Sequence, residues 1–270
     1  MSQVLEEKKL GPLVLTMAAA DLSYPALLSL AAGEVMVIRV QGFIDSATCA
    51  LIAQRAEGHG YSSYLNVPSV RRIGMAFYET DNRTDLVDDY FRSARLNISN
   101  FREACAPYLS PIDTLRCMLD EVWPPGANLQ TLGERKMFIG LSRMVEAGTT
   151  FLAHHDKFSE DAPGHAESTS LLAQFGANVY IQMPESGGDL VMWKQEISTP
   201  EFDELRGDEY GVSIERLGKP DVTVTPRPGD LLIFNSRKMH AVLMGTGRSR
   251  LALSCFVGYR GPSKPLTFWS

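Results

Sequence analysis

The sequence has few cysteines and no long hydrophobic run. Its four cysteines are widely spaced along 270 residues, and none forms a Cys-x-x-Cys pair. This pattern excludes a small disulfide-stapled framework and favours reduced, mostly buried thiols. No stretch approaches the roughly 20 consecutive apolar residues that span a membrane, and the charged start at residues 1–9 is unlike a secretory signal. We therefore expect a cytoplasmic protein without a membrane segment.

Positive charge is also scarce. The chain has 26 Lys and Arg against 32 Asp and Glu, which gives a formal net charge of -6. The basic residues are scattered rather than gathered in a stripe, and this argues against binding to nucleic acid. Hydrophobic residues, at 44%, are abundant enough for a sizeable core. We therefore expect neither nucleic acid nor a membrane as partner, and the sequence indicates no particular oligomeric state.

The first half of the chain is predicted to be mainly helical. Residues 35–40 are β-branched and apolar, which is typical of a strand. Residues 48–57 have apolar side chains on one side, as expected of a helix. From 84 to 109 the apolar positions recur at helical spacing, and residues 112–122 repeat the pattern. These helices are expected to support the second half of the chain.

After residue 135 the pattern changes to short strand-like runs bounded by Gly, Pro, Asn or Ser. The runs are residues 137–145, 150–155, 177–183, 189–193, 222–225, 230–234, 241–244 and 251–257. Eight short strands at this density are typical of a double-sheet jelly roll, the cupin-like barrel. Residues 199–210 are predicted to form a helical insertion between strands.

We therefore predict an α+β fold built as a single domain over residues 1–270. An α-rich part, residues 1–135, would pack against a double-stranded β-helix formed by residues 136–270. A chain of this length commonly forms one undivided domain when it contains a β-barrel.

His154 and Asp156 stand at the end of an apolar run, two residues apart. Side chains on a strand alternate with period two, so this spacing places an imidazole and a carboxylate on one face. His155 would point the opposite way, into packing around the site. An isolated His-x-Asp pair is a weak signal, and it is either half of a metal site or a coincidence.

His240 and Arg250 follow in an order that favours the metal site. His240 comes 84 residues after Asp156, just beyond a Pro-Gly-Asp turn and an apolar strand at residues 228–235. Two histidines and one carboxylate leave coordination positions open, as in non-haem Fe(II) oxygenases. Arg250 begins the next strand, where its guanidinium is suited to clamp a carboxylate in a bidentate fork. Singly, His240 and Arg250 are more often structural residues.

Together these residues resemble the Fe(II)/2-oxoglutarate-dependent oxygenases. The similarity is greatest to the small-molecule branch that contains the welwitindolinone-type carbon halogenases and the N-acyl amino-acid hydroxylases. It extends over most of the chain. Besides the His-x-Asp, His and Arg set, it includes residues 88–91, 101–105, 185–191, 228–235 and 268–270.

The resemblance implies roles for four residues. His154, Asp156 and His240 match the iron ligands, and Arg250 matches the arginine that pairs with the distal carboxylate of 2-oxoglutarate. The halogenases carry glycine at the position of Asp156, where the vacancy admits chloride. The carboxylate in this chain fills that position, so hydroxylation is expected and halogenation is disfavoured.

Other residues are weaker candidates for binding the cosubstrate or the substrate. Asn178 and Tyr180 alternate on one face of a predicted strand, where contact with 2-oxoglutarate and wall packing are equal alternatives. Arg143 matches an arginine of the resembling family and is either a substrate contact or part of a structural ion pair. His165 follows the motif in a loop, where a solvated position is favoured over a lid that faces substrate.

The resemblance further implies that residues 64–78 of the helical half line the substrate pocket. Phe77 and Tyr78 are the aromatic candidates there, and Arg71 and Arg72 are candidates for gripping an anionic substrate. For the two arginines, surface placement is the favoured alternative.

The predicted function is that of an Fe(II)/2-oxoglutarate-dependent dioxygenase. It would hydroxylate an unactivated C–H bond of an amino-acid derivative or natural-product intermediate, with O2 as cosubstrate, and convert 2-oxoglutarate to succinate and CO2. Two alternatives stay open. The same site would also suit desaturation, cyclisation or oxidative removal of a substituent, and a cupin-type protein could bind metal or ligand without catalysis.

Overall fold

The computed structural model describes residues 11–58, 62–63 and 69–270. Its largest element is a ten-stranded sheet. The strands of this sheet are β1 (Val14–Ala18), β2 (Val37–Gln41), β3 (Ser62–Ser63), β4 (Val70–Ile73), β5 (Ala127–Leu129), β8 (Leu141–Val145), β9 (Ala173–Gln182), β13 (Leu231–Asn235), β16 (Arg250–Tyr259) and β17 (Leu266–Trp269). They run in the order β1-β2-β13-β9-β16-β8-β4-β3, with β17 pairing β16 and β5.

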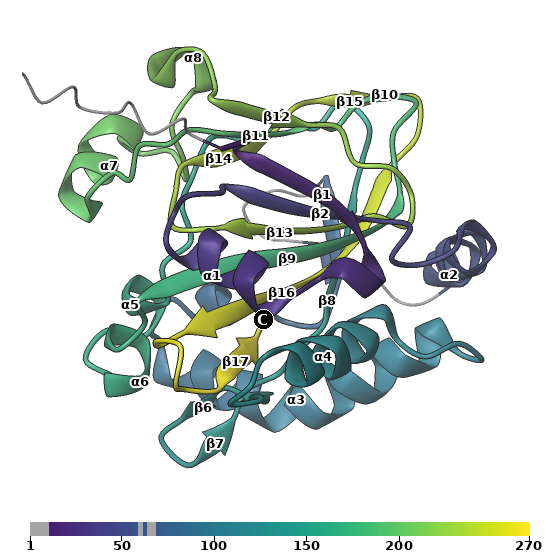
Figure 1. The fold of residues 1–270 in the computed structure, drawn as a ribbon, viewed down its shortest axis with the longest axis horizontal. Helices are drawn as coiled ribbons and strands as arrows, with labels where there is room; N and C mark the ends of the chain where they lie inside the picture. The colour runs from purple at the N-terminus through teal and green to yellow at the C-terminus, as the bar shows by residue number, and fades with distance from the viewer. Residues whose placement is uncertain (1–10, 59–61, 64–68) are drawn as a thin grey trace, which may run out of the picture.

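A second sheet of three strands lies over one face of the large sheet (Figure 1). Its strands are β12 (Val222–Val224), β11 (Leu190–Met192) and β14 (His240–Val242), in that order. Apolar side chains from both sheets fill the space between them, among them Tyr180 and Phe234 from the large sheet and Met192 from the small one. The described strands form separate sheets rather than one closed barrel, which corrects the expectation of a cupin-like barrel in its closed form.

Helices cover the other face of the large sheet. The helices on this side are α1 (Tyr24–Ala31), α2 (Ser46–Gly58), α3 (Thr84–Cys105) and α4 (Pro111–Val122). Figure 1 draws α3 and α4 below the sheet in this view. Because side chains alternate along a strand, Val179 and Ile181 of β9 pack toward these helices while Tyr180 faces the small sheet. The large sheet is therefore buried on both faces.

The helices predicted in the first half of the chain are present, but this half also contributes strands. β1 pairs β2 in parallel, and β2 joins the large sheet through β13. β4 pairs β8, and β5 pairs β17. The first 135 residues are thus less uniformly helical than the sequence pattern predicts, because part of this half extends the large sheet.

Two predicted strands differ from those observed. Residues 137–145 form a strand only from Leu141, because Gly140 has a φ of 104° that interrupts the extended backbone. Residues 150–155 are not a regular strand, and their pairing consists of isolated bridges at Ala153 and His154. The predicted helical insertion is present as α7 (Thr199–Arg206), and α8 (Ile214–Leu217) follows it.

Short elements complete the described part of the fold. The short helices are η1 (Ala19–Asp21), η2 (Phe77–Thr80), α5 (Phe158–Asp161) and α6 (Ala166–Thr169). Two further pairs of strands form two-stranded sheets: β10 (Ser186–Gly187) pairs with β15 (Gly245–Thr246), and β6 (Thr131–Leu132) pairs with β7 (Arg135–Lys136).

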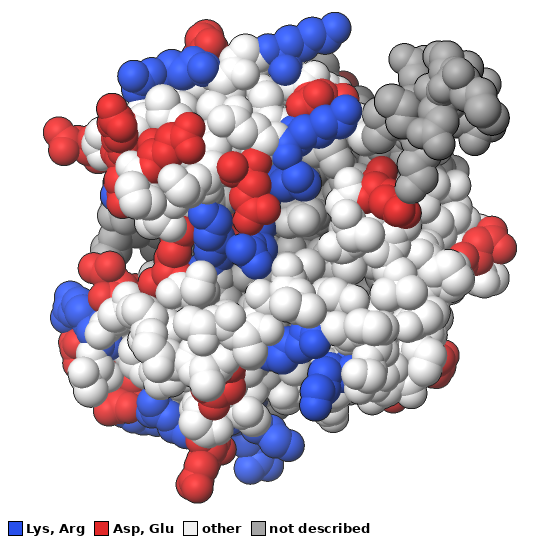
Figure 2. Space-filling model, turned by 60° about the vertical axis from the view of Figure 1, so that its left-hand side comes forward, with Lys and Arg blue, Asp and Glu red and all other residues white. Residues whose placement is uncertain are grey.

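No helix among the described residues is long and apolar enough to cross a bilayer. The four cysteines are free, and only Cys117 is exposed. Acidic and basic side chains are interspersed over the face drawn in Figure 2.

Candidate metal centre and cosubstrate site

A direct backbone pairing brings together the two halves of the predicted metal site. His154 and His240 exchange both N–H···O bonds, each 2.9 Å from nitrogen to oxygen. His240 begins β14, which is held in the small sheet by β11. Two residues after His154, the Asp156 N–H donates to the Ser236 carbonyl at 2.8 Å. The long separation in sequence is thus closed by strand pairing, and residues directly opposite in such a pair present their side chains on the same side.

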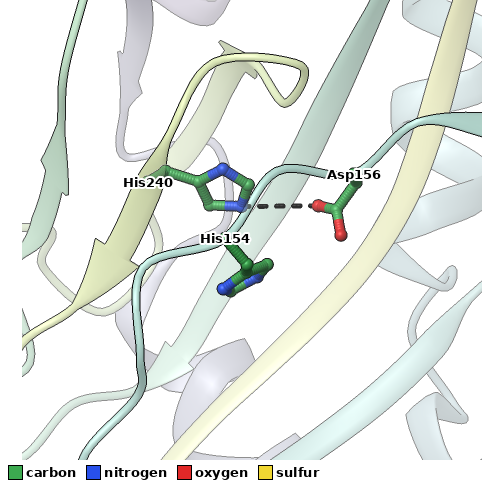
Figure 3. A group of neighbouring side chains, drawn as sticks. All are labelled: His154, Asp156 and His240. Carbon is green, nitrogen blue, oxygen red and sulfur yellow. Dashed lines mark ion pairs between the residues drawn. The ribbon is translucent and has the colours of Figure 1, made fainter. Parts of the chain in front are cut away.

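The side chains of His154, Asp156 and His240 point toward one another (Figure 3). One ligand atom from each lies within 4.8 Å of the other two. The His240 Nε2 atom is 3.3 Å from Oδ2 of Asp156, and the two imidazole centroids are 4.5 Å apart. The structure therefore gathers the three residues that the sequence predicts as ligands, at the edge of the space between the two sheets.

Hydrogen bonds to the backbone fix which imidazole nitrogens face the site. Nδ1 of His154 lies 2.9 Å from the Leu152 carbonyl, and Nδ1 of His240 lies 2.9 Å from the Lys238 carbonyl. A carbonyl oxygen only accepts, so both Nδ1 atoms carry the proton and donate. Each Nε2 then has a free lone pair, which is the arrangement that holds a histidine ready to bind a metal.

The electrostatics of the site favour the forms that bind a cation. Burial, together with the neighbouring His240, lowers the pKa of His154 to about 4. Burial alone would raise the pKa of Asp156, but contact with the imidazole of His240 in its protonated form and the charge of protonated His154 outweigh burial and lower this pKa to about 2. At neutral pH the site presents a neutral imidazole and a carboxylate. Two nitrogen donors and one oxygen donor that converge in this way fit a ferrous ion with open coordination positions.

His155 points away from the triad, as its position in the motif predicts. Its side chain is only 1% exposed and packs 4.3 Å, centroid to centroid, from the ring of Phe202 in α7. Its Nε2 atom lies 3.4 Å from Glu160, which also accepts a hydrogen bond from Thr199. These contacts join the motif to the start of α7.

The segment between α7 and α8 also contacts the residues just before His154 and Asp156. Ala153 and Val212 exchange two backbone hydrogen bonds of 2.7 and 2.8 Å, and the Leu152 N–H donates to the Tyr210 hydroxyl at 2.7 Å. Between them, Gly211 approaches so closely that an added Cβ would lie 2.7 Å from the Ala153 carbonyl oxygen. The sequence reasoning missed these contacts, because no spacing in the sequence links this insertion to the motif.

Arg250 is a buried cation without a hydrogen-bond or ion-pair partner among the described residues. Its side chain lies at the start of β16, with 9% of the residue exposed, and its guanidinium makes no hydrogen bond or ion pair with the described residues. The ring of Phe151 lies 5.4 Å from it, and a small cavity beside it is lined by apolar residues such as Val145 and Val242. Burial lowers the pKa of Arg250, and Arg143 adds to this effect while Tyr180 opposes it. A buried guanidinium that lacks a hydrogen-bond or ion-pair partner is suited to bind the carboxylate of a ligand.

Asn178 and Tyr180 lie on the strand next to Arg250. In the register of β9 with β16, Tyr180 is opposite Ala252 and Asn178 is opposite Ser254. The Tyr180 hydroxyl is fully buried and has no hydrogen-bond partner among the described residues. Two unsatisfied polar groups, the Arg250 guanidinium and this hydroxyl, therefore flank the same part of the interior. The contact of Asn178 and Tyr180 with 2-oxoglutarate stays a prediction.

Arg143 lies on a strand near the triad, and Tyr78 lies near Arg143. Arg143 is on β8, opposite Ala252, and its charge contributes to lowering the pKa of both His154 and Asp156. Its guanidinium is 6.0 Å from the ring of Tyr78, which is 39% exposed. Substrate contacts from Arg143 and Tyr78 stay predictions.

The remaining predicted substrate contacts lie elsewhere. Phe77 is buried in a core cluster and packs against Tyr90 and Phe158, whereas His165 is exposed before α6. Arg72 forms an ion pair with Glu79, and Arg71 lies at 3.9 Å from Glu146. The start of the predicted pocket region, Tyr64, is outside the described residues, as is His59. Substrate contacts from these residues stay predictions.

Comparisons with known proteins agree with this geometry. Residues 139–258 match the family model of the 2OG-Fe(II) oxygenase superfamily. L-gamma-glutamyl-L-propargylglycine hydroxylase from Streptantibioticus cattleyicolor is 31% identical over 162 residues, which is 59% of this chain and 59% of that protein. The aligned segment thus spans less than two thirds of the relative's own length.

Solved structures extend the comparison over nearly the whole chain. An N-substituted L-amino acid dioxygenase from Burkholderia ambifaria AMMD is 18% identical, with a TM-score of 0.61 and 91% of each chain covered. The same enzyme in complex with alpha-KG gives a TM-score of 0.61 at 17% identity, with 91% of this chain and 90% of that chain covered. At these identities the likeness establishes the fold, which is the jelly roll of this class of oxygenases.

In fold, and in the match of residues 139–258 to this family model, the chain is similar to the 2-oxoglutarate-dependent oxygenases, and its His154, Asp156 and His240 form a group that could hold a metal ion.

Proposed function

We propose that the protein is an Fe(II)/2-oxoglutarate-dependent dioxygenase that hydroxylates an unactivated C–H bond of an amino-acid derivative. The observation that carries the proposal is the triad of His154, Asp156 and His240 beside the unpaired guanidinium of Arg250. The two proteins to which it is similar are named as acting on a dipeptide and on N-substituted amino acids, which supports a small amino-acid derivative as substrate.

Each proposed residue has one task. His154, Asp156 and His240 hold the metal through two Nε2 atoms and one carboxylate, and Arg250 binds the distal carboxylate of 2-oxoglutarate. Bound iron and 2-oxoglutarate supply the oxidising chemistry with O2, and succinate and CO2 are released. The protein aims one C–H bond at the metal and keeps the site dry. In this proposal residues 1–270 act as one domain, with residues 1–135 supporting the site and forming the substrate pocket and residues 136–270 carrying the metal.

Asp156 favours hydroxylation as the outcome. Its carboxylate occupies the position at which the resembling halogenases have glycine and accept chloride. A filled position leaves no room for a halide ligand, so oxygen is the group transferred to the substrate.

The test uses the purified protein with Fe(II) and 2-oxoglutarate. Mixed without oxygen, the three components should give the visible charge-transfer absorption of a metal-bound 2-oxo acid, and admission of air should release succinate. L-gamma-glutamyl-L-propargylglycine and N-acyl L-amino acids serve as probes, with a mass gain of one oxygen as the signature of hydroxylation.

The matched variants are Asp156→Ala and Asp208→Ala, which each remove one carboxylate. Asp208 is exposed and lies outside the triad, so its variant should behave as wild type. Loss of a ligand should reduce turnover by on the order of 100-fold or more at limiting iron. Wild-type turnover by Asp156→Ala would refute the ligand assignment. A colourless mixture that releases no succinate in air would identify a binding protein instead.

A further inference from the structure

Thr149 carries a buried hydroxyl that lacks a partner. Its Oγ1 atom is shielded from solvent and makes no hydrogen bond with the described residues, although a hydroxyl both donates and accepts. A buried polar group without a partner costs free energy, and a ligand that completes the bond accounts for its presence. The position of Thr149 in the fold shows which ligand this is.

A turn after β8 brings Thr149 next to Arg250. β8 ends at Val145, which is opposite Arg250 in the register of β8 with β16. The chain then reverses, and the Gly148 N–H donates to the Gly245 carbonyl at 2.8 Å, which ties the turn to β15. Thr149 and Arg250 therefore line the same small cavity, together with Val145.

Alternate side chains of the segment before the triad face this cavity. Thr149 and Phe151 line it, whereas Thr150 between them is exposed, as expected of an extended chain. The ring of Phe151 lies 5.4 Å from the guanidinium of Arg250. Two buried atoms without a hydrogen-bond partner thus belong to this cavity, Oγ1 of Thr149 and Nε of Arg250.

The cavity is suited to a carboxylate. Two other charged side chains line it, but Glu146 is in an exposed ion pair, and Nε of Arg248 donates to the Met183 carbonyl at 2.8 Å. Of the charged residues on this cavity, Arg250 is the one without a hydrogen bond or ion pair among the described residues. A guanidinium only donates, and a carboxylate has two oxygens that can accept from Arg250 and from the Thr149 hydroxyl together.

β14 connects this cavity to the metal site. His240 and Val242 are two residues apart on β14 and are opposite Met192 and Leu190 of β11, so their side chains lie on one face of the strand. His240 belongs to the triad, and Val242 lines the cavity. Two residues of strand span about 6–7 Å, which suits a short dicarboxylate with one end at the triad and the other in the cavity.

We propose that the Thr149 hydroxyl donates to the distal carboxylate of 2-oxoglutarate beside Arg250, and that it thereby helps to select a 2-oxo diacid over a 2-oxo monoacid. This inference rests on the proposed function, because it needs the same metal and cosubstrate. Loss of a hydrogen bond to a charged group weakens binding by roughly 10- to 100-fold. The loss concerns the distal carboxylate alone, so a 2-oxo acid without that carboxylate should bind equally well when the hydroxyl is removed.

The experiment titrates 2-oxo acids without oxygen into the protein loaded with Fe(II) and obtains Kd from the visible absorption of the metal-bound 2-oxo acid. The probes are 2-oxoglutarate and 2-oxopentanoate, which has the same chain length but no second carboxylate. Thr149→Val removes the hydroxyl and keeps the shape, with Thr149→Ala as a second variant, and Thr149→Ser keeps the hydroxyl. Thr150→Val is the control at the exposed neighbour. Urea unfolding measures the stability of each ligand-free variant.

Thr149→Val should raise the Kd of 2-oxoglutarate by about tenfold or more and leave that of 2-oxopentanoate unchanged, whereas Thr149→Ser and Thr150→Val should bind both as wild type does. If 2-oxopentanoate gives no band with wild type, the affinity for Fe(II) is the value that must stay unchanged. Because the hydroxyl has no partner among the described residues, its removal should leave the urea midpoint unchanged or raised.

The inference is overturned if Thr149→Val keeps the wild-type Kd for 2-oxoglutarate, because the hydroxyl then does not contact the carboxylate. It is also overturned if the variant weakens both probes or Fe(II) alike, or if neither Thr149→Val nor Thr149→Ala folds, because Thr149 is then a structural residue. In these cases the proposed function still stands, whereas absence of the 2-oxoglutarate band in wild type removes the proposed function itself.

Discussion

At the scale of single residues, the charged groups of the site fall into two kinds. Asp156 and Glu160 are partnered by histidines within the protein. The Arg250 guanidinium is buried and has no hydrogen bond or ion pair with the described residues. Unpaired charge in the interior lowers stability, and proteins keep it where a ligand completes the pair. In the proposed function, the unpaired guanidinium of Arg250 therefore marks where 2-oxoglutarate binds, while the paired groups hold the motif in place.

Replacement of Arg250 by Met is expected to weaken 2-oxoglutarate binding without loss of stability. Met removes the guanidinium that would bind the distal carboxylate, so the KM for 2-oxoglutarate should rise by roughly 10- to 100-fold, the equivalent of one charge-assisted contact. Since the cation has no protein partner, its removal should leave the urea midpoint of the ligand-free protein unchanged or raised. Steady-state kinetics at varied 2-oxoglutarate and urea unfolding measure the two effects.

The matched control is Arg92→Met, because Arg92 is 75% exposed and pairs only with Asp89 on the surface of α3. It should retain the wild-type KM. A wild-type KM in Arg250→Met, or a large fall in its stability, would show that Arg250 is a structural residue.

The sequence could predict which residues come together only where the spacing along the chain already sets the direction of their side chains. The spacing of His154 and Asp156 places them on one face, and the structure gathers them with His240 although their segment is not a regular strand. Tyr210 gave no such signal. Its contact with Leu152 depends on which distant elements pack together, and that information is absent from spacing along the chain.

At the scale of elements, the insertion that contains α7 and α8 holds the metal motif in position. It contacts the motif through the ring of Phe202, the hydroxyl of Tyr210 and the backbone of Val212. The motif itself has only isolated bridges rather than a ladder of strand pairs. Contacts with the insertion therefore substitute for the pairing that a regular strand would have.

Gly211→Ala should disturb the metal site through this contact. The added methyl would lie 2.7 Å from the Ala153 carbonyl oxygen and 2.8 Å from the Cβ of Leu152, so the motif must move. Overpacking of this kind costs about 1–3 kcal/mol of unfolding free energy. Displaced supporting contacts typically weaken metal affinity by roughly 10- to 100-fold. Anaerobic Fe(II) titration and urea unfolding measure both effects.

Gly11→Ala is the control, since an added Cβ there meets nothing within 4 Å and its φ is not positive. It should bind iron as wild type does. If Gly211→Ala also keeps wild-type iron affinity, the insertion does not position the motif.

The helices and strands that the sequence predicted best are those with the clearest apolar periodicity. The amphipathic helices α3 and α4 and the buried strands β13 and β16 were expected close to their observed bounds, because a sustained apolar period survives most tertiary contexts. β1 and β5 were missed, since both are short and lack fully buried positions. Such strands gain their structure from the neighbour they pair with, β2 in one case and β17 in the other.

At the scale of the whole molecule, the site joins parts that meet only in the folded chain. The motif segment supplies His154 and Asp156, β14 supplies His240, and β16 supplies Arg250. In the unfolded chain these groups are far apart, so Fe(II) and 2-oxoglutarate should bind the native state almost exclusively. Ligands of that kind stabilise a fold by mass action.

Fe(II) with 2-oxoglutarate should therefore raise the thermal unfolding midpoint, and a chelator should reverse the gain. A ligand at 100 times its dissociation constant stabilises by about 2.7 kcal/mol, which for a chain of this size corresponds to roughly 5–10 °C. Scanning calorimetry without oxygen measures the shift. Asp156→Ala should abolish it, and Arg250→Met should keep the part due to iron while losing the part due to 2-oxoglutarate. Equal shifts in wild type and both variants would place the binding of iron and 2-oxoglutarate elsewhere in the molecule.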